Sequence, residues 1–453
     1  MSNLLGALRN AAGAMRVIER GMAVVQANVT NASTPGYARQ RQALSAMAFD
    51  LDRGLVGGVA SAGTLGSRSL FAEASVRRQA HLLGAMEERA SQLSRLEPVF
   101  SVSGAQGVSG ALTRFFQAAS ALAVTPNDGA ARQHLLSQAG MAAAAFHHAS
   151  AGLAESLSAA DRGLQSALHG IESAAARLQQ LNRQFKQDFR AQDDAGLDAQ
   201  LTNLLEELAE LADFTMLRAE DGSVSIFLGG QTPLVIGERL YSVTADPAPA
   251  GALLRDHEGR DITAQITGGR LAALLELRNS LLPGYQQELD ELAAAFAGGV
   301  NAVLAAGVDQ DGNPPALDLF TFDAAAGAAR TLALTAITPR ELALASPAAP
   351  GGNANALALA ALEQERPVHG ATFAQAYGAL AGRLGRDLAA ARDEASLQRQ
   401  LSAQARELRD EVSRVNLDEE AIALMEFQRA YQATARVVQA VDEMMDTLLG
   451  MVR

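Results

Sequence analysis

The side chains that could do chemistry in this sequence do not fall into the spacings of known catalytic or metal sites. Seven histidines are present, and none belongs to an HExxH pair or to a Cys/His ligand set. The two adjacent histidines, His147 and His148, would point to different faces of a helix. The absence of cysteine excludes thiolate metal ligands and cysteine nucleophiles. We therefore predict no metal site and no catalytic histidine.

An acidic stretch resembles the start of a calcium-binding loop. Asp309, Asp311 and Asn313 have the alternate spacing of the first ligands of an EF-hand. An EF-hand also needs glycine at the sixth loop position and glutamate at the twelfth, where this chain has Pro314 and Phe320. The sequence favours a solvated turn here and predicts no cofactor.

Patterns for nucleophilic catalysis and for phosphate binding are also missing. No GxSxG elbow occurs that would place a serine nucleophile on a strand-to-helix turn. The glycines between residues 54 and 63 do not follow the GxGxxG or P-loop spacing that cradles a phosphate. We predict that the protein is not an enzyme and that it has no catalytic or cofactor-binding residues.

Composition points to a mainly α-helical, acidic protein. The 453 residues are 48% hydrophobic and only 4% aromatic, with a net charge of −13. Alanine and leucine are abundant, and both favour helices. An acidic chain without a basic cluster is unsuited to nucleic acid, whose binding needs cations to displace counterions from phosphates. The length is sufficient for two to four domains.

The N-terminal residues do not resemble a cleaved signal peptide. No basic region precedes the first apolar residues, and Arg16, Glu19 and Arg20 interrupt the apolar run. No stretch of about 18 apolar residues occurs that would suit a membrane-spanning helix. We therefore expect no membrane-spanning helix. If the protein leaves the cell, we expect it to use a route that does not require a cleaved signal peptide.

Both ends of the chain carry apolar residues at the heptad spacing of a coiled coil. Near the C-terminus, Leu417, Leu424, Tyr431, Val438 and Met445 lie seven residues apart, after the possible N-cap Asn416. An amphipathic helix is marginal alone in water, so each row must be covered by the other end, by another subunit, or by both. The predicted assembly interface is Leu4, Leu8, Met15, Ile18, Met22, Val25, Val29, Leu417, Leu424, Phe427, Tyr431, Val438, Met445, Leu448 and Leu449.

A turn is expected directly after the N-terminal helix. Thr34 is pushed out of the α region because Pro35 follows it. Pro35 and Gly36 suit the two central positions of a type II turn, where glycine supplies the positive φ angle. Together with Tyr37, this turn is a candidate hinge between the helix and the rest of the chain.

Long helical patterns fill most of the remaining sequence. They cover residues 71–96, 111–124, 130–192, 197–211, 270–282, 285–306 and 372–415, with short strands predicted between 214 and 243 and at 262–266. The predicted fold class is mainly α, with paired terminal helices, a long-helix bundle body and a small β-rich insertion. The predicted domains are 1–65 with 412–453 (terminal helices), 66–213 with 270–306 and 370–411 (helical body), 214–269 (β-hairpins) and 307–369 (irregular surface).

The motifs at the two ends resemble those of the flagellar rod, hook and hook-associated protein family. Residues 25–37 (VQANVTNASTPGY) are similar to its N-terminal signature, and residues 415–420 (VNLDEE) with 427–433 (FQRAYQA) to its C-terminal one. The middle, including LTRFF at 112–116 and LNRQ at 181–184, is similar to the helical domain of its hook-associated members. The signature positions at the N-terminal end include Asn28, Asn31, Thr34, Pro35, Gly36 and Tyr37.

This resemblance implies a secreted structural subunit at the junction between hook and filament. The terminal helices would form the inner layer of a tubular assembly. Expected partners are copies of the chain, the hook protein, the second hook-associated junction protein and an export chaperone that binds the C-terminal helix. The resemblance also implies export through the flagellar secretion channel with an uncleaved N-terminus. The chain departs from the family pattern at Ala27, at Asn203, Glu206 and Glu207, and in its shorter length.

Two alternatives to a junction subunit stay open. The chain could be another flagellar axial protein of the hook or rod type. It could instead be an independent helical binding module or adhesin, whose terminal helices fold into an ordinary core of the monomer. Proteolysis of the monomer separates assembly helices from a core, because segments that wait for a partner are digested first.

Overall fold

The computed structural model describes residues 2–50, 55–100, 107–188, 191, 194–248 and 251–451. The predicted fold class, mainly α with small antiparallel sheets, is confirmed. The helices are α1 (Ser2–Asn31), α2 (Leu70–Leu96), α3 (Val108–Val124), α4 (Gly129–Gln187), α5 (Ala195–Leu211), α6 (Gly269–Glu276), α7 (Leu282–Ala305), α8 (Ala328–Thr331), α9 (Ala354–Ala361), α10 (Phe373–Ser413) and α11 (Leu417–Met451). No helix in these ranges has the length and apolar character needed to cross a membrane.

The strands form small antiparallel sheets. One long hairpin consists of β1 (Gln40–Asp50) and β2 (Leu55–Gly66). A four-stranded sheet has the order β3 (Phe214–Arg218), β4 (Val224–Leu228), β5 (Thr232–Ile236), β6 (Arg239–Leu240). Two further pairs are β7 (Thr244–Ala248) with β8 (Gly251–Arg255) and β9 (Phe320–Thr321) with β10 (Ala333–Leu334). The hairpins expected between 214 and 243 are therefore present.

The chain divides into two compact units. The first unit contains Met1–Leu83, Gly170–Ser242 and Gln398–Arg453, and the second contains Gly84–His169 and Val243–Leu397. This division runs through the long helices α2, α4 and α10, which each contribute to both units. The four-part division by residue ranges stays a prediction.

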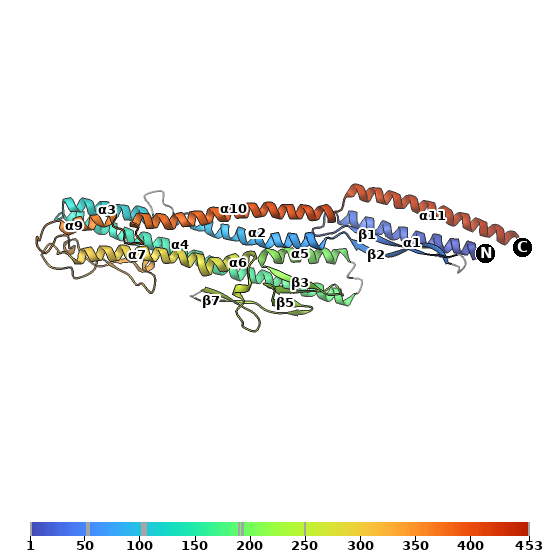
Figure 1. Cartoon of the computed structure of the whole chain (residues 1–453), viewed down its shortest axis with the longest axis horizontal. Coiled ribbons are helices and arrows are strands. Elements are labelled where there is room, and N and C mark those ends of the chain that lie inside the picture. The colour runs from blue at the N-terminus through green and yellow to red at the C-terminus, as the bar shows by residue number, and fades with distance from the viewer. Residues whose placement is uncertain are drawn as a thin grey trace. The chain divides into compact units, whose positions relative to one another are not determined.

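Within the first unit, the two ends of the chain lie side by side. Figure 1 shows α1 and α11 running antiparallel, with the N- and C-termini close together. The β1–β2 hairpin lies along α1. In the same unit, the first turns of α2 and the helix α5 contribute the buried side chains of Val76, Ala80, Leu204 and Leu208.

The second unit is built around a cluster of aromatic rings. The ring centroids of Phe296 lie 5.2 Å from those of both Phe115 and Phe320, and Phe116 stacks on Phe373 at 5.9 Å. All five side chains are buried. Edge-to-face and offset contacts of this kind add to the apolar area that the rings remove from water. The cluster joins α3, α7 and α10 to the irregular region of residues 307–369, in which α9 was not predicted.

Two local predictions are wrong. The strand expected at 262–266 is a single 3₁₀ turn (Thr263–Gln265). Its start is fixed by Asp261, whose carboxylate accepts hydrogen bonds from the Thr263 backbone N–H at 2.9 Å and from its hydroxyl at 2.6 Å. These bonds compete with strand pairing, as in an Asx-turn.

The helix break expected at Pro283 does not occur. A π-helical turn (Leu277–Leu281) connects α6 directly to α7, and Pro283 lies in the first turn of α7. Proline lacks an N–H and clashes with the carbonyl four residues before it in a regular helix. The wider π turn shifts that carbonyl, so the helix continues through the proline.

Candidate functional site: the paired terminal helices and their joint

The contact between α1 and α11 uses one face of each helix. On α1 this face contains Val17, Val25 and Asn28, whose exposed fractions are 8%, 5% and 1%. Gly21 lies on the same face, and a Cβ atom there would be 2.6 Å from Cζ of Phe427. The backbone of α1 therefore approaches α11 closely at this point, and the absence of a side chain at Gly21 makes the approach possible.

The predicted assembly interface is only partly covered by this contact. Val25 is buried, whereas Val29, Leu417 and Leu448 are 45%, 54% and 42% exposed. The side chain of Leu449 lies outside the described part of the structure. The remaining predicted residues are half-buried: Leu4, Leu8, Met15, Ile18, Met22, Leu424, Phe427, Tyr431, Val438 and Met445.

The apolar heptad row of α1 flanks the intramolecular contact and does not form its centre. Successive residues on a helix are 100° apart, so Leu8, Met15 and Met22 lie roughly a quarter turn away from Gly21 and Val25. A heptad search favours apolar residues and passes over glycine and asparagine. For this reason it found Val25 but selected mostly flanking residues, and it missed Gly21 and Asn28 at the centre of the contact.

A buried asparagine connects both ends of the chain. The Asn28 amide nitrogen donates to the Gln40 carbonyl at 2.9 Å and to Oε2 of Glu420 at 3.0 Å. Its carbonyl oxygen accepts from the Gln40 backbone N–H at 2.9 Å and from the Tyr37 hydroxyl at 3.0 Å. All four hydrogen-bonding positions of the amide are used. Asn28 thus joins α1, the start of β1 and the first turn of α11.

The carboxylate of Glu420 is paired within the same cluster. Glu420 is 2% exposed, and its Oε1 atom accepts from Nε of Arg39 at 2.6 Å. Arg39 also reaches Glu419, and its backbone N–H donates to the Ser413 carbonyl at 2.8 Å. Burial and the negative charge of Glu420 together raise the pKa of the Tyr37 phenol above its usual value. We call Asn28, Tyr37, Arg39 and Glu420 the polar hub.

The predicted type II turn at Pro35 and Gly36 is confirmed. The Tyr37 N–H donates to the Thr34 carbonyl at 3.2 Å, and Gly36 has a φ angle of 72°. The turn contacts α5: Asn203 donates to the Pro35 carbonyl at 2.9 Å, and a Cβ on Gly36 would lie 2.8 Å from the Ala199 carbonyl oxygen. Any side chain at Gly36 would therefore push the turn away from α5.

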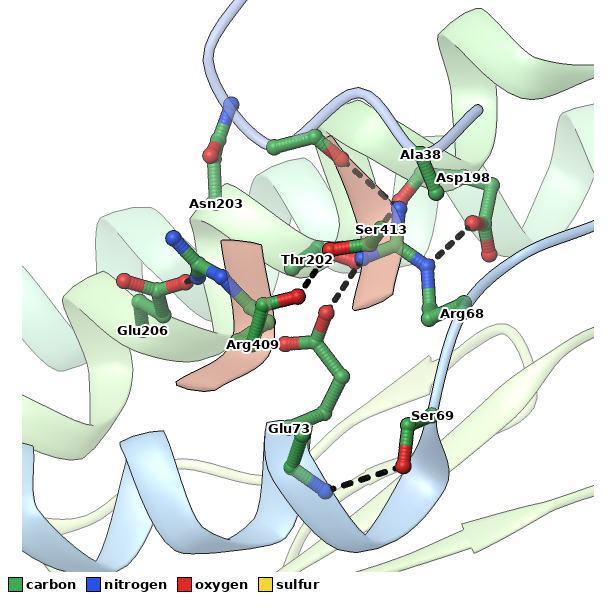
Figure 2. A network of polar contacts seen from close by, with 12 residues as sticks. Ala38, Arg68, Ser69, Glu73, Asp198, Thr202, Asn203, Glu206, Arg409 and Ser413 are labelled. Carbon is green, nitrogen blue, oxygen red and sulfur yellow. Dashed lines mark hydrogen bonds and ion pairs between the residues drawn. The ribbon is translucent and has the colours of Figure 1, made fainter. Parts of the chain in front are cut away.

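Arg68 holds the same turn from the other side (Figure 2). Its guanidinium donates to the Gly36 carbonyl at 2.7 Å, to Glu73 at 2.6 Å and to Asp198 at 2.6 Å. Glu73 is 2% exposed, so this pairing balances a buried charge. Arg68 thereby ties the segment before α2 to α5 and to the turn after α1.

A second arginine in Figure 2 anchors the end of α10. Arg409 pairs with Glu206 of α5, and its backbone carbonyl accepts from the Ser413 hydroxyl at 2.6 Å. The start of α11 is fixed by Asn416, whose side-chain oxygen accepts from the Asp418 N–H at 3.0 Å. This confirms the predicted N-cap.

The family-motif residues divide into two groups. Asn28, Pro35, Gly36 and Tyr37 make the contacts described above. Asn31 bonds only within its own helix turn, to the Ala27 carbonyl at 2.9 Å and to the Thr34 hydroxyl at 3.3 Å. Its amide therefore contributes nothing to the contact between the two terminal helices.

Sequence reasoning missed Arg39, Arg68 and Glu420. Glu420 is the last residue of the C-terminal signature at residues 415–420, and this position was the available signal. A single arginine such as Arg39 or Arg68 gives no pattern, because its partner is far away in the sequence.

The described residues contain no group of three or more His, Asp or Glu side chains arranged to hold a metal ion. In the acidic stretch, Oδ1 of Asp309 accepts from the backbone N–H groups of Asp311 and Asn313, both at 2.8 Å. Asp311 pairs with Arg340 at 2.8 Å. The carboxylate of Asp309 therefore stabilises the turn itself, and the carboxylate of Asp311 is paired with an arginine.

Known proteins resemble this chain along most of its length. Residues 93–320 match the family model "Flagellar hook-associated protein FlgK helical domain", and residues 409–451 match "Flagellar basal body rod FlgEFG protein C-terminal". Flagellar hook-associated protein 1 of Bacillus subtilis is 25% identical over 99% of both chains. The protein of that name from Salmonella typhimurium is 24% identical over 69% of this chain and 58% of its own.

A solved structure has a similar fold. The flagellar hook junction protein FlgK from Burkholderia pseudomallei superposes with a TM-score of 0.67 at 17% identity, over 75% of this chain and all of that one. The family resemblance expected from the terminal motifs is confirmed. Because the helical-domain model alone spans half of the sequence, the chain belongs to the FlgK family of hook-associated proteins, which are structural components of the bacterial flagellum.

Proposed function

We propose that this protein forms the junction between the flagellar hook and the filament by assembling with copies of itself through α1 and α11. One observation carries the proposal. The two terminal helices are held together by a buried polar hub, yet large apolar side chains on them stay exposed. Ile422, Val437 and Met444 are 54%, 51% and 49% exposed. Exposed apolar rows of this kind mark protein contacts.

The polar hub gives the proposed interface its geometry. Buried polar clusters that are fully hydrogen-bonded allow one register and penalise others, because any shift leaves a charge or an amide without a partner. Asn28 and Glu420 would fix α11 against α1 before a neighbouring subunit arrives. A pre-organised helix pair loses less conformational entropy on assembly than two free helices.

The neighbours and the export route form part of the same proposal. The hook protein would lie on one side of the junction and the second hook-associated junction protein on the other. Before assembly, an export chaperone would bind α11, and the chain would leave the cell through the flagellar secretion channel with α1 uncleaved. The relative from Burkholderia pseudomallei, named a hook junction protein, supports this placement. The proposed role is structural and includes no catalytic step.

Replacing Val438 by aspartate tests the role of the terminal helices. Val438 is half-buried on the side of α11 that faces α1, so a carboxylate there becomes an unpaired charge in the contact between the two terminal helices that the proposed assembly requires. We expect the variant to keep its helical body, measured by circular dichroism, and to be absent from isolated flagella. Val124→Asp is the matched control, because Val124 is 80% exposed in the second unit. Normal motility and normal incorporation of Val438→Asp would contradict the proposal.

A further inference from the structure

We infer that neighbouring copies meet through opposite charges: the acidic end of α11 in one copy binds the arginine-bearing outer face of α1 in the next. This inference rests on the proposed assembly and specifies the two surfaces through which neighbouring copies contact each other. The outer face of α1 is defined here by Leu5, Arg9, Arg16 and Arg20. The acidic end of α11 is defined by Asp442, Glu443 and Asp446.

The outer face of α1 is basic and accessible. Arg9, Arg16 and Arg20 are all exposed, and their spacings of seven and four place them in one row along the helix. Leu5, which is 47% exposed, continues this row by four residues toward the N-terminus. The helix contains one acidic residue, Glu19. The row is therefore a positively charged stripe in a protein whose net charge is −13.

The end of α11 has the opposite character. Asp442, Glu443 and Asp446 are exposed, and the sequence has no lysine or arginine between residues 437 and 452. The same turns expose an apolar row of Val437, Met444, Leu448 and Met451, which are 51%, 49%, 42% and 79% exposed. At 100° per residue, the three carboxylates lie on the other side of the helix from this apolar row, so they form a separate charged surface that can steer a basic partner.

Within the part of the chain that the structure describes, these charges are not used in ion pairs. Over the described lengths of α1 and α11, no ion pair involves Arg9, Arg16, Arg20, Asp442, Glu443 or Asp446. The guanidinium of Arg16 makes only a 3.4 Å contact with the Ala12 carbonyl of its own helix. The stripe points away from Gly21 and Val25, which face α11, so the acidic end of the same chain does not lie over it.

The opposite charges of the two surfaces restrict how neighbouring copies can be arranged. The outer face of α1 cannot pair with itself, because arginines would meet arginines. The acidic end of α11 cannot pair with itself for the same reason. When each copy offers its α1 face to one neighbour and its α11 end to another, the copies join head to tail, and such a contact repeats around a ring or along a helix. A tubular assembly needs this kind of interface.

Charge reversal tests the pairing in cells of the source bacterium whose own copy is replaced by each variant. The first variant is Arg16→Glu with Arg20→Glu, the second is Asp442→Arg with Asp446→Arg, and the third carries all four changes. Arg162→Glu is the matched control, since it reverses an exposed arginine of the second unit. The measurements are the amount of the chain in isolated flagella, the amount in the medium, and the swimming rate.

We expect each two-residue variant to be about tenfold depleted from flagella, since like charges then face each other across the contact. The four-residue variant restores attraction and should recover incorporation, and Arg162→Glu should incorporate normally. Normal incorporation of either two-residue variant overturns the inference, and so does failure of the four-residue variant. If Val438→Asp blocks incorporation while these reversals have no effect, the proposed function stands and only the charge pairing is wrong.

Cysteine cross-linking gives a second readout that is independent of motility. The chain contains no cysteine, so a disulfide between an Arg16→Cys copy and a Glu443→Cys copy can form only at the introduced positions. Co-expression of both variants should give a cross-linked dimer in isolated flagella under mild oxidation, and neither variant alone should do so. Equal cross-linking of Arg16→Cys with itself would show a self-paired face and refute the head-to-tail contact.

Discussion

Replacing Asn28 by alanine should loosen the connection between the two ends of the chain. The amide of Asn28 makes four hydrogen bonds and is 1% exposed. Alanine removes all four and leaves the backbone of Gln40, the hydroxyl of Tyr37 and one oxygen of Glu420 without their partner. The buried carboxylate is the most affected group, because a charge in low dielectric depends on its hydrogen bonds.

The size of the effect follows from these contacts. Three of the bonds join neutral groups and contribute about 1 kcal/mol each, and the bond to the carboxylate contributes about 2 kcal/mol. The sum is about 5 kcal/mol. Tyr37 and Gln40 are half-buried, so water can replace part of the loss. We therefore expect a reduction of about 3 kcal/mol in the free energy that opens the α1–α11 contact.

Native-state hydrogen exchange of the purified chain measures this loss locally. A reduction of about 3 kcal/mol corresponds to an exchange rate about 100-fold faster for amides of α1 and α11 that open together. Amides in the aromatic cluster around Phe296 should not change, because they belong to the second unit. Asn31→Ala is the matched control: it removes an asparagine of the same motif whose side chain bonds only within its own helix turn.

Two results would refute this reasoning. The first is an equal effect of Asn28→Ala and Asn31→Ala, which would mean that helix propensity and not the hub is responsible. The second is rapid exchange of α1 and α11 in the unmodified monomer, which would mean that the hub does not form before assembly.

Three further outcomes are expected. Gly21→Ala should lower the melting temperature and the free energy of unfolding, the latter by about 1–3 kcal/mol, because the new methyl group would clash with the ring of Phe427. Gly13→Ala should raise the melting temperature, because alanine favours the helix and no atom lies within 4 Å of the new methyl group. Burial raises the pKa of Tyr377 to about 12 from 10.0, so its contribution to stability is present below pH 10 and is lost as the pH rises toward 12. Urea denaturation at both ends of this range should detect the loss, and Tyr377→Phe should reduce it without removing it, because the pKa values of Tyr37 and Tyr285 are raised as well. Limited proteolysis of the monomer, followed by mass spectrometry, should remove about 35–65 N-terminal and about 40 C-terminal residues before it cuts the helical body, because the exposed apolar face of the helix pair still awaits a partner, and removal should be faster in Asn28→Ala; ends as resistant as the body would favour the independent binding module.

Periodicity was sufficient for the helices and for the general class of fold. Apolar spacing along residues 71–96 and 417–452 predicted α2 and α11 with bounds close to those observed, because a helix that buries one face must repeat apolar residues every three or four positions. Pro35 and Gly36 predicted a type II turn correctly, since the φ angles that such a turn requires are properties of these two residue types. The helix break predicted from Pro283 was wrong, because the π turn just before this proline accommodates it within a continuous helix.

The sequence by itself determined the helical class, the amphipathic ends and the absence of recognisable catalytic motifs, because these depend on residue type and on spacing within one segment. The tertiary structure alone decided which face of α1 is covered and which residues join the two ends. Glu420 and Asn28 are separated by 392 positions, and Arg68 and Asp198 by 130. No local pattern encodes such pairs: a buried carboxylate and its arginine are stable only when the rest of the fold brings them within hydrogen-bonding distance and excludes water.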